Sequence, residues 1–358
     1  MSAFNEWRRV FRHAIVVGSM ALAWTASPGA QSAGPRYEVD TSWPRPFPDR
    51  WVLGGLGGVC VDTRDHVFIL NRQDVLEGDL NAGRLAPPII EVDAAGTLIN
   101  SWGDPKLLDP RLHSCFFDAD GNMWIASSPS GMVQKYSRDG KLLFQIGTKG
   151  VIDSSDGTVK GKPLNSSAAK FFMPSSLFVD PKNGDVYVSD GESRNGNRRV
   201  AVFDRHGAFL RQWQPDGMQT VHCMTVSADG WVYVCNREGS RIQVYDKMGA
   251  FTKNIDVPWK PVTPPADGVL KESGGSAVSL ELSRDPAQRL MYVINQNNSQ
   301  IEIIDRASGK IVSTAGRGTG HFPGQFDQPH GLAVDSQGSI YVTENRGKRI
   351  QKFKVVSR

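Results

Sequence analysis

One pattern recurs six times along the chain and limits what it can fold into. Each copy contains an apolar strand that ends near Asp, a turn with Gly, a second strand rich in aromatic and β-branched residues, and two further strands. The third copy, residues 175–214, shows the whole unit: SSLFVDPKNGDVYVSDGESRNGNRRVAVFDRHGAFLRQWQ. The others begin at GGVCVDTRDHVFIL, HSCFFDADGNMWIA, HCMTVSADGWVYVC, AVSLELSRDPAQRLMYVI and HGLAVDSQGSIYVTEN.

Units of this size cannot each bury a sheet face alone. We therefore expect an all-β chain, folded as the blades of one six-bladed β-propeller. The last unit ends after RIQKFKVV, residues 349–356, without a fourth strand. RYEVD, residues 36–40, is a spare strand near the other end. We expect this N-terminal strand to complete the last blade and close the ring, which removes open sheet edges.

The first 33 residues have the order of an export signal. Arg8, Arg9 and Arg12 precede an apolar run from Ala14 to Trp24, and the small residues of SPGAQSAG follow. RRVF, residues 8–11, also resembles a twin-arginine signal, so Sec and twin-arginine export both stay open. We expect a signal peptide at 1–33, a propeller at 34–358, and a periplasmic or secreted protein without stable membrane insertion.

Charge and cysteine usage narrow the partners and the compartment. The 41 basic and 37 acidic residues are spread through the chain, so we expect no nucleic-acid partner. As a separate expectation, the protein is a monomer. Cys60, Cys115, Cys223 and Cys235 would lie where disulfides form, but their spacing does not fix a pairing. Cys223 and Cys235 could face each other across a hairpin, and buried free thiols are the alternative.

Histidine recurs at one position of the repeat. Five places before the residue that ends the first strand, the six units carry, in order, Gly57, His113, Ser175, His222, Val278 and His330. Alternate blades of a six-bladed ring lie roughly 120° apart, so the three imidazoles should converge at the central channel. Three neutral imidazoles with an open fourth position are typical of catalytic zinc. The remaining histidines lie outside this register and are interpreted as ordinary polar residues: His13, His66, His206 and His321.

The polar ends of the second strands should share this mouth of the channel, because the second strand runs antiparallel to the first. The segments are NRQD (71–74), SSPS (127–130), SDGESRNGNR (189–198), NREG (236–239), NQNNS (295–299) and TENRG (343–347).

The units resemble NHL repeats over about residues 50–356, in motifs such as FDQPHGLAVDSQGSIYVTENRGKRIQKF and FMPSSLFVDPKNGDVYVSDGESRNGNRRVAVFD. The histidine segments RLHSCFFDADGNMWIAS, TVHCMTVSADGWVYV and QPHGLAVDSQGSIYVTE, with the loop LNRQD, look like the peptidyl-α-hydroxyglycine α-amidating lyases. This resemblance implies a secreted propeller that cleaves a C-terminal α-hydroxyglycine into an amide and glyoxylate. It implies zinc on His113, His222 and His330, and a substrate-contacting catalytic role for Arg72.

The resemblance breaks at two positions. The family has a catalytic tyrosine after the Ser-Asp-Gly of its third blade, and this chain has Glu192, which we interpret as the replacement base. The family follows its last zinc-binding histidine with a calcium-binding aspartate, and Gly331 stands here, so the calcium ligand is missing. For Arg72 an alternative also stays open, a salt bridge at the rim with Asp74 or Glu77.

The sequence thus favours a zinc-dependent lyase that cleaves the C–N bond of a carbinolamide, with a small molecule or a peptide C-terminus as substrate. One alternative is a hydrolase resembling the calcium-dependent propeller lactonases, for which the run NQNNS offers amide ligands. Another is a non-catalytic NHL propeller that binds protein or glycan.

Overall fold

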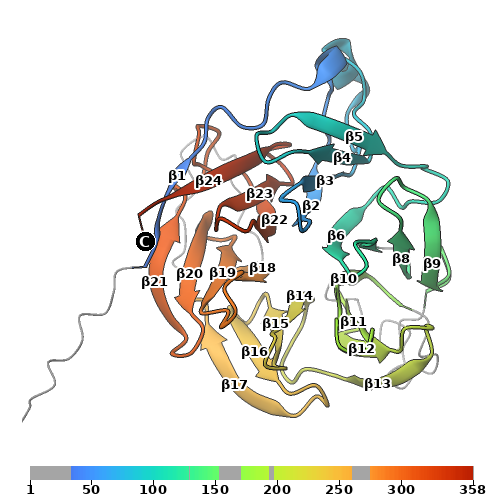
Figure 1. Cartoon of the computed structure of the whole chain (residues 1–358), viewed down its shortest axis with the longest axis vertical. Helices are drawn as coiled ribbons and strands as arrows, with labels where there is room; N and C mark the ends of the chain where they lie inside the picture. The colour runs from blue at the N-terminus through green and yellow to red at the C-terminus, as the bar shows by residue number, and fades with distance from the viewer. Residues whose placement is uncertain (1–33, 129, 153–170, 193–196, 260–274, 358) are drawn as a thin grey trace, which may run out of the picture. The chain divides into compact units, whose positions relative to one another are not determined.

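The computed structural model describes residues 34–128, 130–152, 171–192, 197–259 and 275–357. Its strands form six four-stranded antiparallel sheets that surround a central axis (Figure 1). The all-β six-bladed propeller predicted from the repeat is therefore confirmed. The expected export signal lies outside the described residues. Within the described ranges, no helix has the length and apolar character needed to cross a membrane.

Each blade runs from an inner strand at the channel to an outer strand at the edge of the ring (Figure 1). Blade 1 comprises β2 (Leu56–Val61), β3 (Val67–Asn71), β4 (Ile89–Val92) and β5 (Leu98–Trp102), and blade 2 comprises β6 (Leu112–Phe117), β7 (Met123–Ser127), β8 (Met132–Tyr136) and β9 (Leu142–Gly147). Blade 3 comprises β10 (Pro174–Val179), β11 (Val186–Asp190), β12 (Arg199–Phe203) and β13 (Phe209–Trp213), and blade 4 comprises β14 (Val221–Val226), β15 (Val232–Asn236), β16 (Arg241–Tyr245) and β17 (Phe251–Asp256). Blade 5 comprises β18 (Ala277–Leu282), β19 (Leu290–Asn295), β20 (Gln300–Asp305) and β21 (Lys310–Ala315), and blade 6 comprises β22 (Pro329–Val334), β23 (Ile340–Glu344), β24 (Ile350–Ser357) and β1 (Arg36–Val39). Short 3₁₀ turns, η1 (Pro48–Arg50) and η2 (Glu77–Asn81), lie in the connections before β2 and after β3.

The N-terminal strand closes the ring as predicted. β1 pairs antiparallel with β24, with Tyr37 opposite Val355 and Val39 opposite Phe353. Blade 6 is thus built from both ends of the propeller, which leaves no blade with an unfilled outer position (Figure 1).

The aspartate that ends the first strand of most units holds the following turn. Asp118 Oδ1 accepts hydrogen bonds from the backbone N–H groups of Asp120 and Asn122 at 3.1 and 2.9 Å. Its Oδ2 accepts from Trp124 Nε1 at 2.9 Å, which fixes the aromatic residue of the second strand. Gly121 completes the turn with a φ of +76°, a region that favours glycine. The recurring Asp and Gly are therefore structural.

Apolar packing between neighbouring blades makes the core. Each of six buried clusters draws side chains from two adjacent blades, as where Val59 and Ile69 of blade 1 pack with Ala333 and Tyr341 of blade 6. Each fully buried aliphatic side chain contributes about 1.5–3 kcal/mol. The ring thus provides a rigid support for the loops around the channel.

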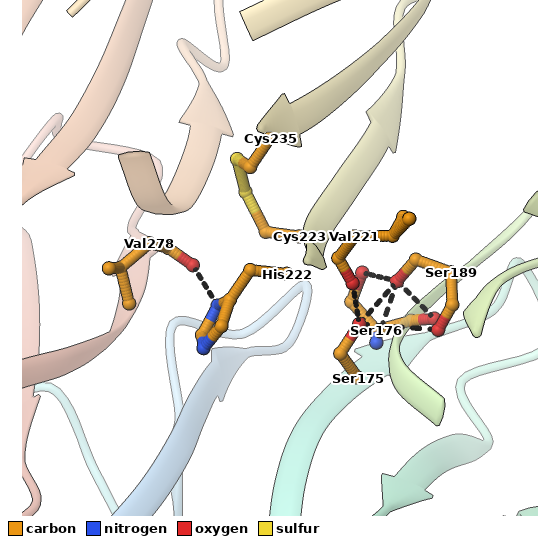
Figure 2. Close-up of a disulfide and its surroundings, with 8 residues drawn as sticks. All are labelled: Ser175, Ser176, Ser189, Val221, His222, Cys223, Cys235 and Val278. Atoms are coloured by element: carbon orange, nitrogen blue, oxygen red, sulfur yellow. Dashed lines mark hydrogen bonds between the residues drawn. A yellow bond between two sulfur atoms is a disulfide. The ribbon is translucent and has the colours of Figure 1, made fainter. Parts of the chain in front are cut away.

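Two disulfides are formed, and the described cysteines include no free thiol. Cys223 and Cys235 join β14 to β15 with a Cα separation of 5.0 Å, which confirms the hairpin pairing (Figure 2). Cys60 and Cys115 join β2 to β6 with a Cα separation of 5.7 Å, a pairing between blades that the sequence spacing did not indicate. The alternative of buried free thiols was wrong.

Candidate metal centre

Each histidine of the repeat lies in a β-bulge at the start of an inner strand. In β6, Leu112 pairs with Ser127 and Ser114 pairs with Ala126, so His113 is an extra residue in the ladder. The pairings of β14 and β22 shift in the same way around His222 and His330. A bulge re-aims the side chain of its extra residue. The local register therefore explains how these side chains turn toward the channel.

The three imidazoles meet on the axis, as their alternation predicts. The ring centroids of His113, His222 and His330 are 4.7–5.2 Å apart, and one ligand atom from each lies within 4.8 Å of the others. The side chains come from blades 2, 4 and 6 and are 4%, 2% and 7% exposed. They line one end of a narrow cavity of about 50 Å³ that continues down the channel.

Backbone carbonyls orient all three rings. His113 Nδ1 lies 2.6 Å from the Ser175 carbonyl oxygen. His222 Nδ1 lies 2.6 Å from the Val278 carbonyl oxygen (Figure 2). His330 Nδ1 makes the same contact, at 2.6 Å, with Gly57. A carbonyl oxygen only accepts, so each Nδ1 carries the proton and each Nε2 keeps a lone pair. Metal-binding histidines commonly donate such a hydrogen bond from the ring nitrogen that does not bind the metal.

Burial and nearby cations keep the rings neutral. Burial, reinforced by the positive charge of Arg72, holds the pKa of His113 and that of His330 well below the usual range. Burial, with the neighbouring His113, does the same for the pKa of His222. Neutral imidazole is the form that binds metals.

The Arg72 guanidinium lies against the histidine cluster. Its Nε donates to the Leu112 carbonyl at 3.0 Å, and its Nη2 lies 3.5 Å from His330 Nε2. The residue is 4% exposed, and burial lowers its pKa to about 10. Asp74 instead accepts a hydrogen bond from the Gly55 N–H at 2.5 Å. The structure thus places Arg72 at the channel and not in the alternative rim salt bridge.

Glu192 faces the same centre from blade 3. Its Oε1 lies 3.8 Å from His113 Nε2, and its Oε2 accepts a hydrogen bond from Ser128 Oγ at 3.1 Å. Its own N–H donates to the Met173 carbonyl at 2.8 Å, which anchors the start of the loop. A carboxylate therefore lies next to the imidazoles.

Sequence reasoning missed Arg237. It follows β15 at the position that Arg72 holds after β3, and its positive charge helps to lower the pKa of His113 and His222. Arg237 Nη2 donates to Gln296 Oε1 at 3.4 Å, whereas its buried Nε has no partner among the described residues. The shared Asn-Arg of NRQD and NREG was the signal that could have identified it.

The donor set fits zinc better than calcium. His113 Nε2 is buried without a hydrogen-bond partner in the described part of the chain, so its lone pair is available to a metal ion. A Cβ at Gly331 would approach Gly58 Cα to 2.7 Å, so an aspartate has no room there. In the run NQNNS, Asn295 Nδ2 donates to Glu302 Oε1 at 2.6 Å and Gln296 Nε2 to the Pro329 carbonyl at 2.9 Å. Those two amides thus serve the fold.

Comparisons with known proteins agree with this architecture. The family model for the NHL repeat matches residues 326–353. NHL repeat-containing protein 3 of Mus musculus is 26% identical over 89% of this chain and 84% of its own length. Peptidyl-glycine alpha-amidating monooxygenase B of Xenopus laevis is 24% identical over 88% of this chain, which spans 35% of that relative. A probable peptidyl-alpha-hydroxyglycine alpha-amidating lyase of Caenorhabditis elegans is 21% identical over 85% of this chain and 83% of its own length.

A solved streptogramin B lyase has the same fold, with a TM-score of 0.56 at 13% identity over 89% of this chain and 97% of that one. The chain is therefore a six-bladed propeller with an NHL repeat, and its distant relatives include amidating lyases and NHL repeat proteins.

Proposed function

We propose that this protein is an exported, zinc-dependent lyase that cleaves the C–N bond of a carbinolamide to give an amide and glyoxylate. The convergence of three neutral imidazoles carries the proposal. His113, His222 and His330 present Nε2 lone pairs to one point, and Nδ1 contacts fix all three tautomers. The names of the distant relatives support the reaction type.

The charges around the histidines favour a substrate that carries a carboxylate. Arg72 and Arg237 lie at matching positions in blades 1 and 4, on opposite sides of the six-bladed propeller. Guanidinium groups bind carboxylates through paired hydrogen bonds, and burial strengthens such contacts. A C-terminal α-hydroxyglycine brings its carboxylate next to the carbon that must react, so the two arginines can hold that end in place.

Glu192 can accept and donate the proton that is transferred during cleavage. The substrate hydroxyl gives its proton to a base, its oxygen forms the C=O bond of glyoxylate, and the electron pair of the broken C–N bond goes to the amide nitrogen. That nitrogen then takes up one proton, so the reaction balances without a redox partner. The Glu192 carboxylate can accept the first proton and return it to the leaving nitrogen.

A zinc ion bound by the three imidazoles would act as a Lewis acid that lowers the pKa of a hydroxyl. The side chains of the protein itself must orient the substrate, limit water and place the base. Arg72 and Arg237 orient the substrate, and the closely packed inner strands limit water at the histidines. Ser128 holds the Glu192 carboxylate through Oε2, which leaves Oε1 on the side of His113.

Glyoxylate release from N-benzoyl-α-hydroxyglycine tests the proposal. We expect release above the uncatalysed rate, loss after treatment with a zinc chelator, and recovery when zinc is restored. Ester cleavage that needs calcium and not zinc would contradict the proposal in favour of a lactonase-like hydrolase. Absence of any zinc-dependent turnover, in a folded protein that captures protein or glycan without metal, would support a scaffold instead.

A further inference from the structure

At the repeat position that carries histidine in blades 2, 4 and 6, blades 1, 3 and 5 carry three residues that differ in their side chains. Gly57, Ser175 and Val278 each accept the Nδ1–H of one histidine through the backbone carbonyl. Gly57 and Val278 have no side-chain hydrogen-bonding group. Ser175 adds a hydroxyl at the same point of the ring, completely buried at 0% exposure. Of these three positions, only that of blade 3, between the histidines of blades 2 and 4, therefore has a side-chain hydroxyl.

The Ser175 hydroxyl points at the strand that carries the next histidine. Its Oγ donates to the Val221 carbonyl at 2.6 Å, and Val221 directly precedes His222 (Figure 2). The Val221 carbonyl belongs to the peptide group that bears the His222 N–H. One residue thus touches the imidazole of His113 through its carbonyl and the peptide plane of His222 through its hydroxyl.

A small hydroxyl cluster fixes the direction of that bond. Ser189 Oγ lies 2.8 Å from Ser175 Oγ and 2.6 Å from Ser176 Oγ. Two carbonyl oxygens, which can only accept, lie near Ser175 Oγ: that of Val221 at 2.6 Å and that of Ser189 at 3.2 Å. The single Ser175 proton goes to the nearer one, on Val221, and Ser175 Oγ can then accept from Ser189 Oγ. Buried hydrogen bonds of this kind polarise and rigidify one another.

We propose that Ser175 is a positioning residue that fixes His113 and His222 relative to each other and so shapes the metal centre. This inference rests on the proposed metal-binding function. His222 lies in a β-bulge, where the ladder does not hold the backbone in regular pairing. The Ser175 hydroxyl supplies a hydrogen bond to the peptide group at that bulge, at the bond that links Val221 to His222.

The test compares Ser175→Ala with Ser176→Ala in the mature protein. Ser176 belongs to the same cluster, but its hydroxyl bonds to Ser189 and not to a histidine strand. Contacts behind metal ligands typically change affinity about 10–100-fold, so we expect zinc to bind Ser175→Ala at least about 10-fold more weakly by chelator competition. Ser176→Ala should stay within a few-fold of the wild type.

The visible absorption spectrum of bound Co²⁺ gives a second readout, independent of activity. The bands should shift in Ser175→Ala and stay unchanged in Ser176→Ala, because they report the arrangement of the ligands. If the alanine variant does not fold, Ser175→Gly replaces it, since glycine is the natural residue at the matching Gly57.

The outcomes separate the two proposals. Wild-type zinc affinity and an unchanged Co²⁺ spectrum in folded Ser175→Ala would overturn the role of Ser175 and leave the metal site standing. Equal weakening in both variants would also overturn it, since the effect would then belong to the cluster as a whole. A wild-type protein that binds neither metal would overturn the proposed function together with this inference.

Discussion

His330 Nδ1 lies 2.6 Å from the carbonyl oxygen of Gly57, a residue 273 positions away in the sequence. The contact joins the inner strand of the last blade to that of the first. Gly57 also lacks the Cβ that would come within 2.8 Å of Arg72 Nε. One glycine therefore orients a histidine with its backbone and makes room for an arginine with its missing side chain.

Gly57→Ala should disturb both neighbours. The new Cβ would lie 1.8 Å from the Leu112 carbonyl, so β2 and β6 must move apart and Arg72 must leave its place. We expect a loss of about 1–3 kcal/mol in the free energy of unfolding, with a larger proportional loss of glyoxylate release. Denaturant titration and the activity assay measure the two effects. Gly78→Ala is the control, since its Cβ would meet nothing within 4 Å, and equal behaviour of the two variants would contradict the packing account.

Glu192→Gln should separate proton transfer from metal binding. An amide keeps the size of the side chain and can still accept from Ser128, but it cannot take up the hydroxyl proton. We expect glyoxylate release to fall on the order of 10²–10⁴-fold, with zinc content unchanged. Unaltered turnover would show that another group accepts the proton. Loss of zinc would instead make Glu192 a ligand.

The two disulfides should differ in their effect on stability. Cys60–Cys115 closes a loop with a sequence separation of 55, and Cys223–Cys235 closes one of 12. Loop-closure entropy assigns about 4 kcal/mol to the longer loop and about 3 kcal/mol to the shorter one. The double variant Cys60→Ser with Cys115→Ser should therefore unfold at a lower denaturant concentration than Cys223→Ser with Cys235→Ser. The reverse order would show that local packing outweighs chain entropy here.

Glu281 should make stability depend on pH near neutrality. The residue lines the channel below the histidines, and burial raises the pKa of its carboxyl from 4.5 to about 7, although the Arg284 charge partly opposes the shift. The folded state holds this proton more tightly than the unfolded chain. The free energy of unfolding should therefore fall as pH rises from about 4.5 to about 7, and stay lower above that window.

Glu281→Gln should remove that decline. At a pH above 7 the variant should be more stable than the wild type, by on the order of 2 kcal/mol, and the two should converge below pH 4.5. Denaturant titration across the range gives the measurement. The exposed Glu77→Gln provides a control with an unchanged profile. A wild-type curve without a fall in this window would mean that the Glu281 carboxylate is well solvated in the channel.

Much of the fold could be predicted from the sequence because the repeated pattern can be aligned residue by residue. The blade count, the spare strand at Arg36–Val39 and the convergence of the histidines follow from a fixed register. The Cys60–Cys115 pair could not be predicted, since it joins two blades whose separation depends on how the ring packs. Arg237 was missed for a related reason. Arginine is common in loops, and only the structure reveals that Arg237 lies across the channel from Arg72.

The bulges were also invisible in the sequence, because a shift in strand pairing leaves no residue signature at His113 or His222. They matter most for the site, since they turn the imidazoles inward.

Zinc content of the purified mature protein, measured by mass spectrometry beside a His222→Ala variant, tests the central claim most directly. The account predicts about one zinc per wild-type chain and a loss of zinc in the variant, because two imidazoles hold the ion far less tightly than three. No zinc in the wild-type protein, even after incubation with the metal, or equal zinc in both proteins, would contradict it.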